Sequence, residues 1–209
     1  METGERCVGN FTIDESLKRA YKETHIEYVE LKEIDPETFF ESIAEAKKIN
    51  FFGPFVERRS KDDYRTMQLF TTLDDSAGIA ITKEGNIVSV FSKGIHKGVL
   101  KTLIPVALSR GGKKLDNFDS ERLSAMYASY GFIPISRTSF DKNFAPKDWD
   151  YEAFGQPDIV FWLHNGDSAE SVIYKFGEYK VDMSKTKKCL NYEEAEKFRD
   201  NILKKLEER

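Results

Sequence analysis

The sequence is poor in the residues that build disulfide scaffolds and metal sites. It has two cysteines, Cys7 and Cys189, which lie near opposite ends of its 209 residues. A disulfide framework or a zinc site needs more such residues at closer spacing. The histidines, His25, His96 and His164, are equally dispersed. We therefore expect no metal, and two free thiols in a reducing compartment.

Long apolar runs are also missing. No stretch approaches the roughly 20 residues that a membrane-spanning helix needs. The opening stretch METGERCVGN lacks the apolar segment of a signal peptide. These two features predict a cytoplasmic protein without a membrane partner.

Neither sign of charge dominates the chain. It carries 32 Lys and Arg against 36 Asp and Glu, a net charge of −4, and the two signs are interspersed. Such a surface has no overall attraction to nucleic acid or to anionic membranes. A nucleic-acid partner is thus the least favoured class, although a local basic cluster could still bind phosphate.

Apolar and aromatic residues, in contrast, are plentiful. Hydrophobic residues make up 40% of the chain and aromatic residues 13%, which is enough for a packed core. The pattern of strands and helices predicts an α+β fold with a mixed, twisted central sheet flanked by helices. We expect an N-terminal arm with a short polar helix at 1–24, a main domain at 25–165 and a C-terminal strand and helix extension at 166–209.

Local signals mark several elements. Asp35 and Pro36 predict the start of a helix, as a cap and a first-turn proline. Two β-rich runs on either side of Gly85 predict a hairpin. Near the C-terminus, residues 171–181 (SVIYKFGEYKV) resemble a strand, and Asn191 is expected to cap a charged closing helix.

The stretch SKGIHKGVLKTLIPVALSRGG leads from a strand through glycines into an apolar-periodic helix. Backbone N–H groups at the start of a helix are unsatisfied and partly positive, so they suit a pyrophosphate. Gly94 and Gly98 would let the backbone approach such a ligand, and Lys93, His96 and Lys97 would add charge. The alternative is an ordinary solvated turn before a helix.

A second stretch, SERLSAMYASYGF, places Tyr127 on a helix four residues before Gly131. In this order, the two stretches resemble the phosphate loop and the tyrosine helix of the GNAT superfamily of acyl-CoA-dependent N-acyltransferases. The resemblance is best over 76–163 and implies a GNAT-like sheet. More loosely, the chain is similar to acetyltransferase-like proteins encoded on phages and mobile elements.

The resemblance implies acetyl-CoA as cosubstrate and an unidentified amine as acceptor. It implies that Tyr127 is the general acid that protonates the departing thiolate, since a phenol stays protonated at neutral pH. Packing with an idle hydroxyl is the other interpretation of this tyrosine. The implied cofactor-binding residues are Phe91, Ser92, Lys93, Gly94, Ile95, His96, Lys97, Gly98 and Asn117.

A general base is not evident. Many relatives carry a glutamate on the fourth strand, but here that strand is NIVSVF, with Ser89 as its one polar inward candidate. A catalytically silent module is therefore the rival hypothesis. It would bind a protein partner through the aromatic loop 141–157 and the C-terminal helix.

Two further features allow alternative interpretations. The aromatic residues of the loop 141–157 could form a lid or binding surface, or could fold back as a small core. The basic run Arg58, Arg59 and Lys61 could bind an acidic substrate or the 3′-phosphate of CoA, or could be a solvated face. The loop aromatics are Phe144, Trp149, Tyr151 and Phe154.

Overall fold

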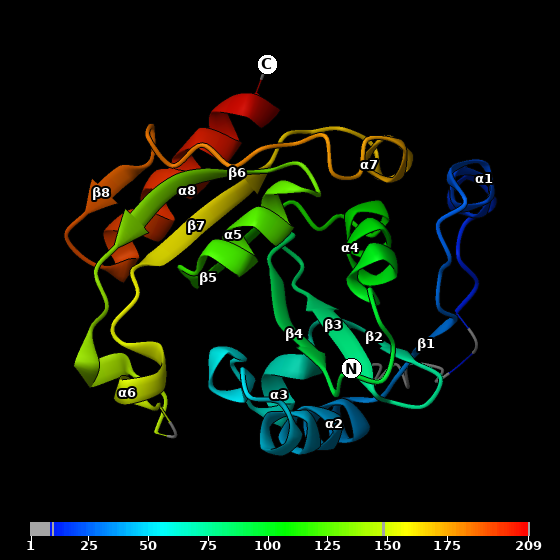
Figure 1. The fold of residues 1–209 in the computed structure, drawn as a ribbon, viewed down its shortest axis with the longest axis horizontal. Helices are drawn as coiled ribbons and strands as arrows, with labels where there is room; N and C mark the ends of the chain where they lie inside the picture. The colour runs from blue at the N-terminus through cyan, green and yellow to red at the C-terminus, as the bar shows by residue number, and fades with distance from the viewer. Residues whose placement is uncertain (1–8, 10, 148, 209) are drawn as a thin grey trace, which may run out of the picture. The chain divides into compact units, whose positions relative to one another are not determined.

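The computed structural model describes residues 9, 11–147 and 149–208, so Cys7 lies outside the described part. The chain forms two compact units (Figure 1). The first holds Met1–Gly112 with Ser168–Tyr174, and the second holds Lys113–Asp167 with Lys175–Arg209. Each has its own sheet with helices, so the predicted α+β class is confirmed. The domain boundaries expected after residues 24 and 165 stay predictions.

The first unit is built on a four-stranded antiparallel sheet in the order β1-β2-β3-β4. The hairpin predicted around Gly85 is confirmed, and Gly85 has a φ of 76°, which glycine adopts without strain. The elements are α1 (Glu15–Thr24), β1 (Leu31–Glu33), α2 (Pro36–Ile49), η1 (Gly53–Phe55), α3 (Lys61–Tyr64), β2 (Gln68–Thr72), β3 (Ala77–Ile81), β4 (Ile87–Ser92), α4 (Leu100–Ser109) and α7 (Ala169–Tyr174).

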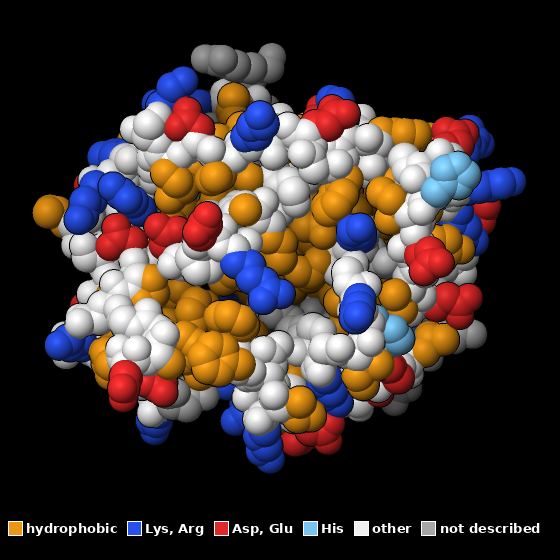
Figure 2. Space-filling view, viewed as in Figure 1, with side chains coloured by type: hydrophobic (Ala, Val, Ile, Leu, Met, Phe, Trp, Pro, Cys, Tyr) orange, Lys and Arg blue, Asp and Glu red, His pale blue; other side chains and the backbone are white. Residues whose placement is uncertain are grey.

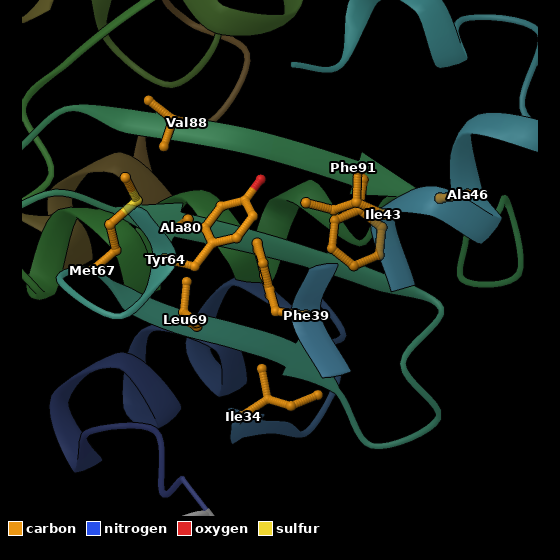
Figure 3. Packing of buried hydrophobic residues seen from close by; sticks show 10 residues of the cluster. All are labelled: Ile34, Phe39, Ile43, Ala46, Tyr64, Met67, Leu69, Ala80, Val88 and Phe91. Carbon is orange, nitrogen blue, oxygen red and sulfur yellow. The ribbon is translucent and has the colours of Figure 1, made fainter. Parts of the chain in front are cut away.

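Helix α2 covers one face of this sheet, and Figure 1 places α4 on the other face. The predicted cap is confirmed: the Asp35 side chain accepts a hydrogen bond from the Thr38 N–H, with Pro36 in the first turn. Burial of a large apolar side chain in such a core is worth about 1.5–3 kcal/mol. Figure 3 shows the cluster between α2 and the sheet, which holds Ile34, Phe39, Ile43, Ala46, Tyr64, Met67, Leu69, Ala80, Val88 and Phe91.

The short helix predicted in 1–24 is present as α1, and it has one apolar face that the sequence analysis did not single out. Its residues Leu17, Ala20 and Tyr21 are buried, because their spacing puts them on one face, and the helix packs against α7. Asp14 precedes the helix but makes no capping hydrogen bond through its side chain.

The strand predicted over 171–181 is wrong. Residues 169–174 form α7, in which Ala169, Val172 and Ile173 are buried and the helix packs against α1 and α4. These positions follow the i, i+3, i+4 spacing of a helical face, which outweighs the β-propensity of the SVIY run.

The second unit is built on a mixed four-stranded sheet in the order β5-β7-β6-β8, in which β6 and β8 are parallel. Helix α5 lies on one face and α8 on the other (Figure 1). The elements are β5 (Lys114–Phe118), α5 (Glu121–Ala128), β6 (Phe132–Thr138), η2 (Lys142–Phe144), α6 (Tyr151–Phe154), β7 (Ile159–His164), β8 (Lys187–Cys189) and α8 (Tyr192–Glu207).

The C-terminal strand β8 pairs with β6 of this sheet, and the C-terminal helix α8 packs against β6 and β7. The Asn191 side chain caps α8 by accepting from the Glu194 N–H at 2.9 Å, as predicted. The helix turns Ala195 toward β6 and β7, and Cys189 of β8 is a buried free thiol in the same cluster. The strand of this segment is β8 at Lys187–Cys189, and not the residues 171–181 for which a strand was predicted.

The described surface mixes its charges. On the face drawn in Figure 2, Lys and Arg side chains alternate with Asp and Glu. In the part of the chain that the structure describes, no helix is both long and apolar enough to cross a membrane.

Candidate functional site

Strand β4 is one of the two edge strands of the first sheet and carries a β-bulge. Its register with β3 shifts between Gly78 and Ala80, so β4 has an extra residue there. Ser89, at the bulge, has a φ of 52°, a left-handed conformation that is uncommon outside glycine. Bulges bend a strand and redirect its end. Here the redirected end is the one that leads into the loop 93–98.

The Ser89 side chain is engaged in a chain of hydrogen bonds. Its hydroxyl donates to the Glu57 carbonyl at 2.9 Å, and a carbonyl can only accept, so Ser89 must accept from the Tyr64 hydroxyl at 2.8 Å. Tyr64 in turn accepts from the Arg59 N–H at 3.0 Å. Ser89 is therefore occupied, and it does not supply the missing base.

The loop 93–98 exposes backbone N–H groups. Gly94 and Gly98 have φ angles of 81° and 71°, which glycine tolerates and other residues rarely adopt. Helix α4 follows, and no side chain caps its start. Within the described residues, the structure records no hydrogen-bond acceptor for the N–H groups of Ile95, His96, Lys97, Gly98 and Leu100. Such a run of free donors at a helix start suits an anion.

The side chains of this loop are less free than the sequence suggests. Lys93 donates to Glu45 at 2.7 Å, and this hydrogen bond lowers the pKa of the Glu45 carboxyl. His96 Nε2 lies 3.0 Å from Asp74 Oδ2. Among the described residues Lys97 has no recorded partner, and it is exposed. Lys93 and His96 already have carboxylate partners, so of the three basic side chains Lys97 alone has no partner among the described residues.

The end of β4 is partly occupied by its own unit. Phe91 is buried and its ring packs 5.5 Å from that of Phe39. The carbonyl of Ser92, one of the implied cofactor-binding residues, accepts from the Asn50 side-chain amide at 2.9 Å. The Ser92 hydroxyl accepts from the Gly94 N–H at 3.0 Å, which ties the strand to the loop. Ile95 is 63% exposed at the loop tip.

The basic run before β2 pairs with neighbours. Arg59 lies 2.9 Å from Glu57, and Lys61 lies 3.7 Å from Glu41. The Arg58 guanidinium stacks over the Phe40 ring at 4.3 Å. Paired and stacked charges of this kind form an ordinary solvated face, which is the simpler of the two interpretations.

Tyr127 lies on α5 in the second unit with its side chain buried. Its ring packs at 6.1 Å from Phe132 and 6.5 Å from Trp162. Burial, with a smaller effect of Asp116, raises the pKa of the phenol well above its ordinary value. Among the described residues its hydroxyl has no recorded hydrogen-bond partner. The phenol therefore stays protonated and keeps its proton available to an acceptor.

Asn117 lies on β5, the edge strand of the second sheet. Its side-chain oxygen accepts from Trp162 Nε1 at 2.6 Å, and its amide donates to the Phe118 carbonyl at 2.7 Å. Trp162 thus contacts both predicted residues of this unit, Asn117 through its N–H and Tyr127 through its ring. No pattern in the sequence singles out this tryptophan.

The aromatic loop folds back on itself. Trp149 is 7% exposed, donates to the Gly155 carbonyl at 3.0 Å, and packs 4.5 Å from Phe118 and 5.3 Å from Phe154. Phe144, in contrast, is 85% exposed. Of the two interpretations of this loop, the small core holds for Trp149 and not for Phe144.

A buried charge network joins β5 to α8, and sequence patterns missed it. Arg199 is 0% exposed, donates to Asp200 at 2.8 Å and donates to the Leu115 carbonyl at 3.2 Å. Lys114, also buried, donates to the other Asp200 oxygen at 2.8 Å. Arg199 falls four residues after Ala195, on the apolar face of α8, so this spacing was the signal available.

No metal centre emerges from the described residues, where no three His, Cys, Asp or Glu side chains group closely enough to hold an ion. The candidate site residues therefore fall into two sets. The stretch 91–98 belongs to the first unit, and Asn117 and Tyr127 belong to the second.

Comparisons with known proteins give little more. No family model and no curated protein matches the chain. A crystal structure from Rhodopseudomonas palustris, described as a GCN5-related N-acetyltransferase and as "Aminotransferase, Class-II", matches with a TM-score of 0.43 at 13% identity. The match covers 66% of this chain and 96% of that chain. A likeness of this size carries no inference about activity or residue roles, and the similarity to phage-encoded proteins stays a prediction.

Proposed function

We propose that the chain is an acyl-CoA-dependent N-acyltransferase that moves an acetyl group from acetyl-CoA to an amine. The observation that carries the proposal is the loop 93–98. Its free N–H groups, its left-handed Gly94 and Gly98 and the unpaired Lys97 make a site for a pyrophosphate at the start of α4.

Tyr127 would act as the general acid of the reaction. The amine nitrogen attacks the thioester carbonyl carbon, the C–S bond breaks, and the thiolate takes the proton of the phenol. Because burial raises the pKa of Tyr127, the phenol is fully protonated at neutral pH. The amine binds in its neutral form. After the attack its nitrogen loses one proton to solvent, and the Tyr127 phenolate later takes a proton from solvent.

Calorimetric titration with acetyl-CoA and with desulfo-CoA tests the loop. Replacement of the exposed Lys97 by Ala should weaken binding of both about three- to tenfold, as loss of one charge-assisted phosphate contact does. Lys83→Ala is the matched control, since Lys83 is an exposed lysine in the turn between β3 and β4. If the wild-type protein binds neither compound at millimolar concentration, the proposal is wrong.

Turnover tests the tyrosine. Tyr127→Phe should keep the affinity for acetyl-CoA and lower turnover by about 100-fold or more, which is the usual contribution of a general acid. Tyr130→Phe is the matched control, because Tyr130 is also buried and follows the same helix. Unchanged turnover in Tyr127→Phe would remove this residue from the mechanism.

The structure gives less support to a silent module that binds a partner. That hypothesis needs a free face on α8 and exposed aromatics in the loop 141–157. The Ala195 and Arg199 face of α8 is buried on the sheet of its own unit, and Trp149 is buried in the loop core, whereas Phe144 and Tyr151 of the loop are exposed. Deletion of 166–209 would therefore remove part of two units rather than a docking surface.

A further inference from the structure

We propose that the outer edge of β8 binds an extended acidic segment of a partner protein, which adds to the second sheet as a further strand. The inference does not rest on the proposed function, because β8 holds none of the candidate site residues. Two cations carry it. Arg137 of β6 and Lys188 of β8 lie opposite one another beside this edge.

The backbone of β8 is open on one side. The strand is the last in the order β5-β7-β6-β8, and among the described residues no strand pairs with its outer side (Figure 1). Its other side pairs with β6 in parallel over Lys187–Cys189. An edge strand keeps backbone N–H and C=O groups that an extended peptide can bind. The outer side of β8 thus offers main-chain hydrogen bonds to an added strand.

The side chains of Arg137 and Lys188 point to the same face of the sheet. Cys189 is buried in a cluster with Ala195 of α8, so the neighbouring Lys188 points to the face away from α8. On β6, the Ser136 hydroxyl donates to the Ala195 carbonyl at 2.7 Å, so the next residue, Arg137, also points away from α8. Since the two cations are register partners, their side chains lie side by side.

The chain supplies little negative charge for this pair. Like charges directly opposite one another on neighbouring strands are unfavourable. Asp158 Oδ2 lies 3.8 Å from Arg137 Nε, which is too far for a hydrogen bond, and this Nε is buried without a hydrogen-bond partner. Lys188 is exposed, and no partner is recorded for it among the described residues. A carboxylate from outside the chain would relieve the repulsion and bind both cations.

The surroundings of the strand suit an acidic segment with apolar residues. Lys and Arg side chains gather over the position of β8 in Figure 2, and exposed Lys185 precedes the strand. Leu190, which follows the strand, is 92% exposed and offers an apolar contact. Lys187 is held on the other face, where its Nζ lies 3.7 Å from Glu194 and 4.2 Å from the centre of the Phe198 ring.

The same cations exclude a second copy of this chain as the occupant. Lysines on a short edge strand repel strands of their own kind, which protects many proteins from aggregation. A second copy would place the positive charges of its own β8 beside Lys188, at a cost in free energy. An acidic strand turns the same charges into an attraction. The edge therefore selects its partner by charge.

The experiment measures the fluorescence anisotropy of labelled octapeptides with the full-length protein. The peptides alternate valine with glutamate, glutamine or lysine, and a fourth is the glutamate peptide with every backbone nitrogen methylated. The glutamate peptide should bind about tenfold more tightly than the glutamine peptide, because it alone carries carboxylates. The methylated peptide keeps the carboxylates but lacks backbone donors, so it should bind about fivefold more weakly than its parent.

Replacement of the two cations tests their roles. Lys188→Glu should weaken binding of the glutamate peptide by about tenfold or more, and should make the lysine peptide the preferred one. A mere defect in folding cannot produce this reversal. Arg137→Gln should weaken binding of the glutamate peptide by about three- to tenfold, through loss of a charge-assisted contact.

Lys205→Glu is the matched control. It changes the net charge of the protein by the same amount as Lys188→Glu, at an exposed lysine of α8. Lys205 lies about 16 Å along the helix from Glu194, the α8 residue beside Lys187. This replacement should leave the binding of all four peptides unchanged.

Each result decides the proposal. Absence of binding to the glutamate peptide, or equal binding of the glutamine peptide, overturns it. Equal binding of the methylated peptide would show that the cations bind carboxylates without strand addition, which also overturns it. A loss in Lys205→Glu as large as that in Lys188→Glu would reduce the effect to net charge. Dimerisation of the wild-type protein in competition with the glutamate peptide would assign the edge to a second copy instead.

Discussion

The two strands that carry the candidate site residues are each the edge of a sheet, and they are anchored in different ways. Strand β4 is held by neutral groups. The Tyr64 hydroxyl donates to Ser89, and Ser89 donates to the Glu57 carbonyl. Each hydrogen bond in this Tyr64–Ser89–Glu57 series joins uncharged atoms.

Strand β5 is held by charges. Lys114 at its start donates to Asp200, and Arg199 donates both to Asp200 and to the Leu115 carbonyl. All three charged residues lie in or beside the packing of α8 against the sheet.

An edge strand can thus be fixed without a second neighbouring strand in two ways. A central strand forms backbone hydrogen bonds to a neighbouring strand on both sides, whereas an edge strand forms them on one side only. Side-chain anchors replace part of the missing ladder in both units. A neutral anchor costs little to bury and is indifferent to pH, whereas a charged anchor is expensive to desolvate and very costly to break.

The largest expected effect is therefore in the charged anchor. Arg199→Ala should lower the free energy of unfolding of the second unit by about 2–5 kcal/mol, because it removes a fully buried side chain and the donor to the Leu115 carbonyl, whereas Asp200 keeps its hydrogen bond from Lys114. Urea unfolding followed by tryptophan fluorescence measures it, since both tryptophans, Trp149 and Trp162, belong to this unit.

Two further variants sharpen this test. Arg199→Met keeps much of the volume and removes the charge, so it should cost less than Arg199→Ala. Lys197→Ala removes an exposed charge from the same helix and should change little. If Arg199→Ala costs less than about 1 kcal/mol, the network is not an anchor.

The neutral anchor should give a smaller effect. Tyr64→Phe removes the donor to Ser89 and the acceptor of the Arg59 N–H, which should cost about 1–3 kcal/mol. The first unit has no tryptophan, so circular dichroism in urea is the measurement. Tyr28→Phe, at an exposed tyrosine, is the control. A loss of stability that varies strongly between pH 5 and 8 would contradict the neutral character of this anchor.

Features that depend only on residues close together in the sequence, such as helix caps and tight turns, were predicted from the sequence. The caps at Asp35 and Asn191 and the turn at Gly85 each need a few adjacent positions, and each was predicted correctly. The glycine loop and the tyrosine helix were found in the same way, through short motifs whose functional roles stay proposals.

Contacts between distant residues could not be predicted. Pro105 lies inside α4 and cannot donate to the Lys101 carbonyl, yet the Tyr21 hydroxyl donates to that carbonyl at 2.7 Å. A residue of α1 thus replaces the missing helical bond. Arg199 and Trp162 were missed for the same reason, because their partners lie far away in the sequence.

The smallest expected effect is the response of the second unit to acid through His164. Its Nε2 lies 3.0 Å from the Tyr130 carbonyl and its Nδ1 accepts from the Gly166 N–H at 3.3 Å, so the ring is neutral with its hydrogen on Nε2. Burial lowers the pKa of His164 below its ordinary value of about 6.5. The unfolded chain then binds a proton that the folded unit does not, as the pH falls below 6.5 toward the folded pKa.

The stability of the second unit should therefore fall over that pH interval, and it should level off below the folded pKa. Urea unfolding followed by tryptophan fluorescence between pH 7.5 and 5 measures this loss. His164→Gln should flatten the dependence, whereas His25→Gln, at an exposed histidine of the first unit, should not. A slope that survives in His164→Gln would assign the acid response to the Lys114, Asp200 and Arg199 anchor instead, and would make the charged strand the pH-sensitive one.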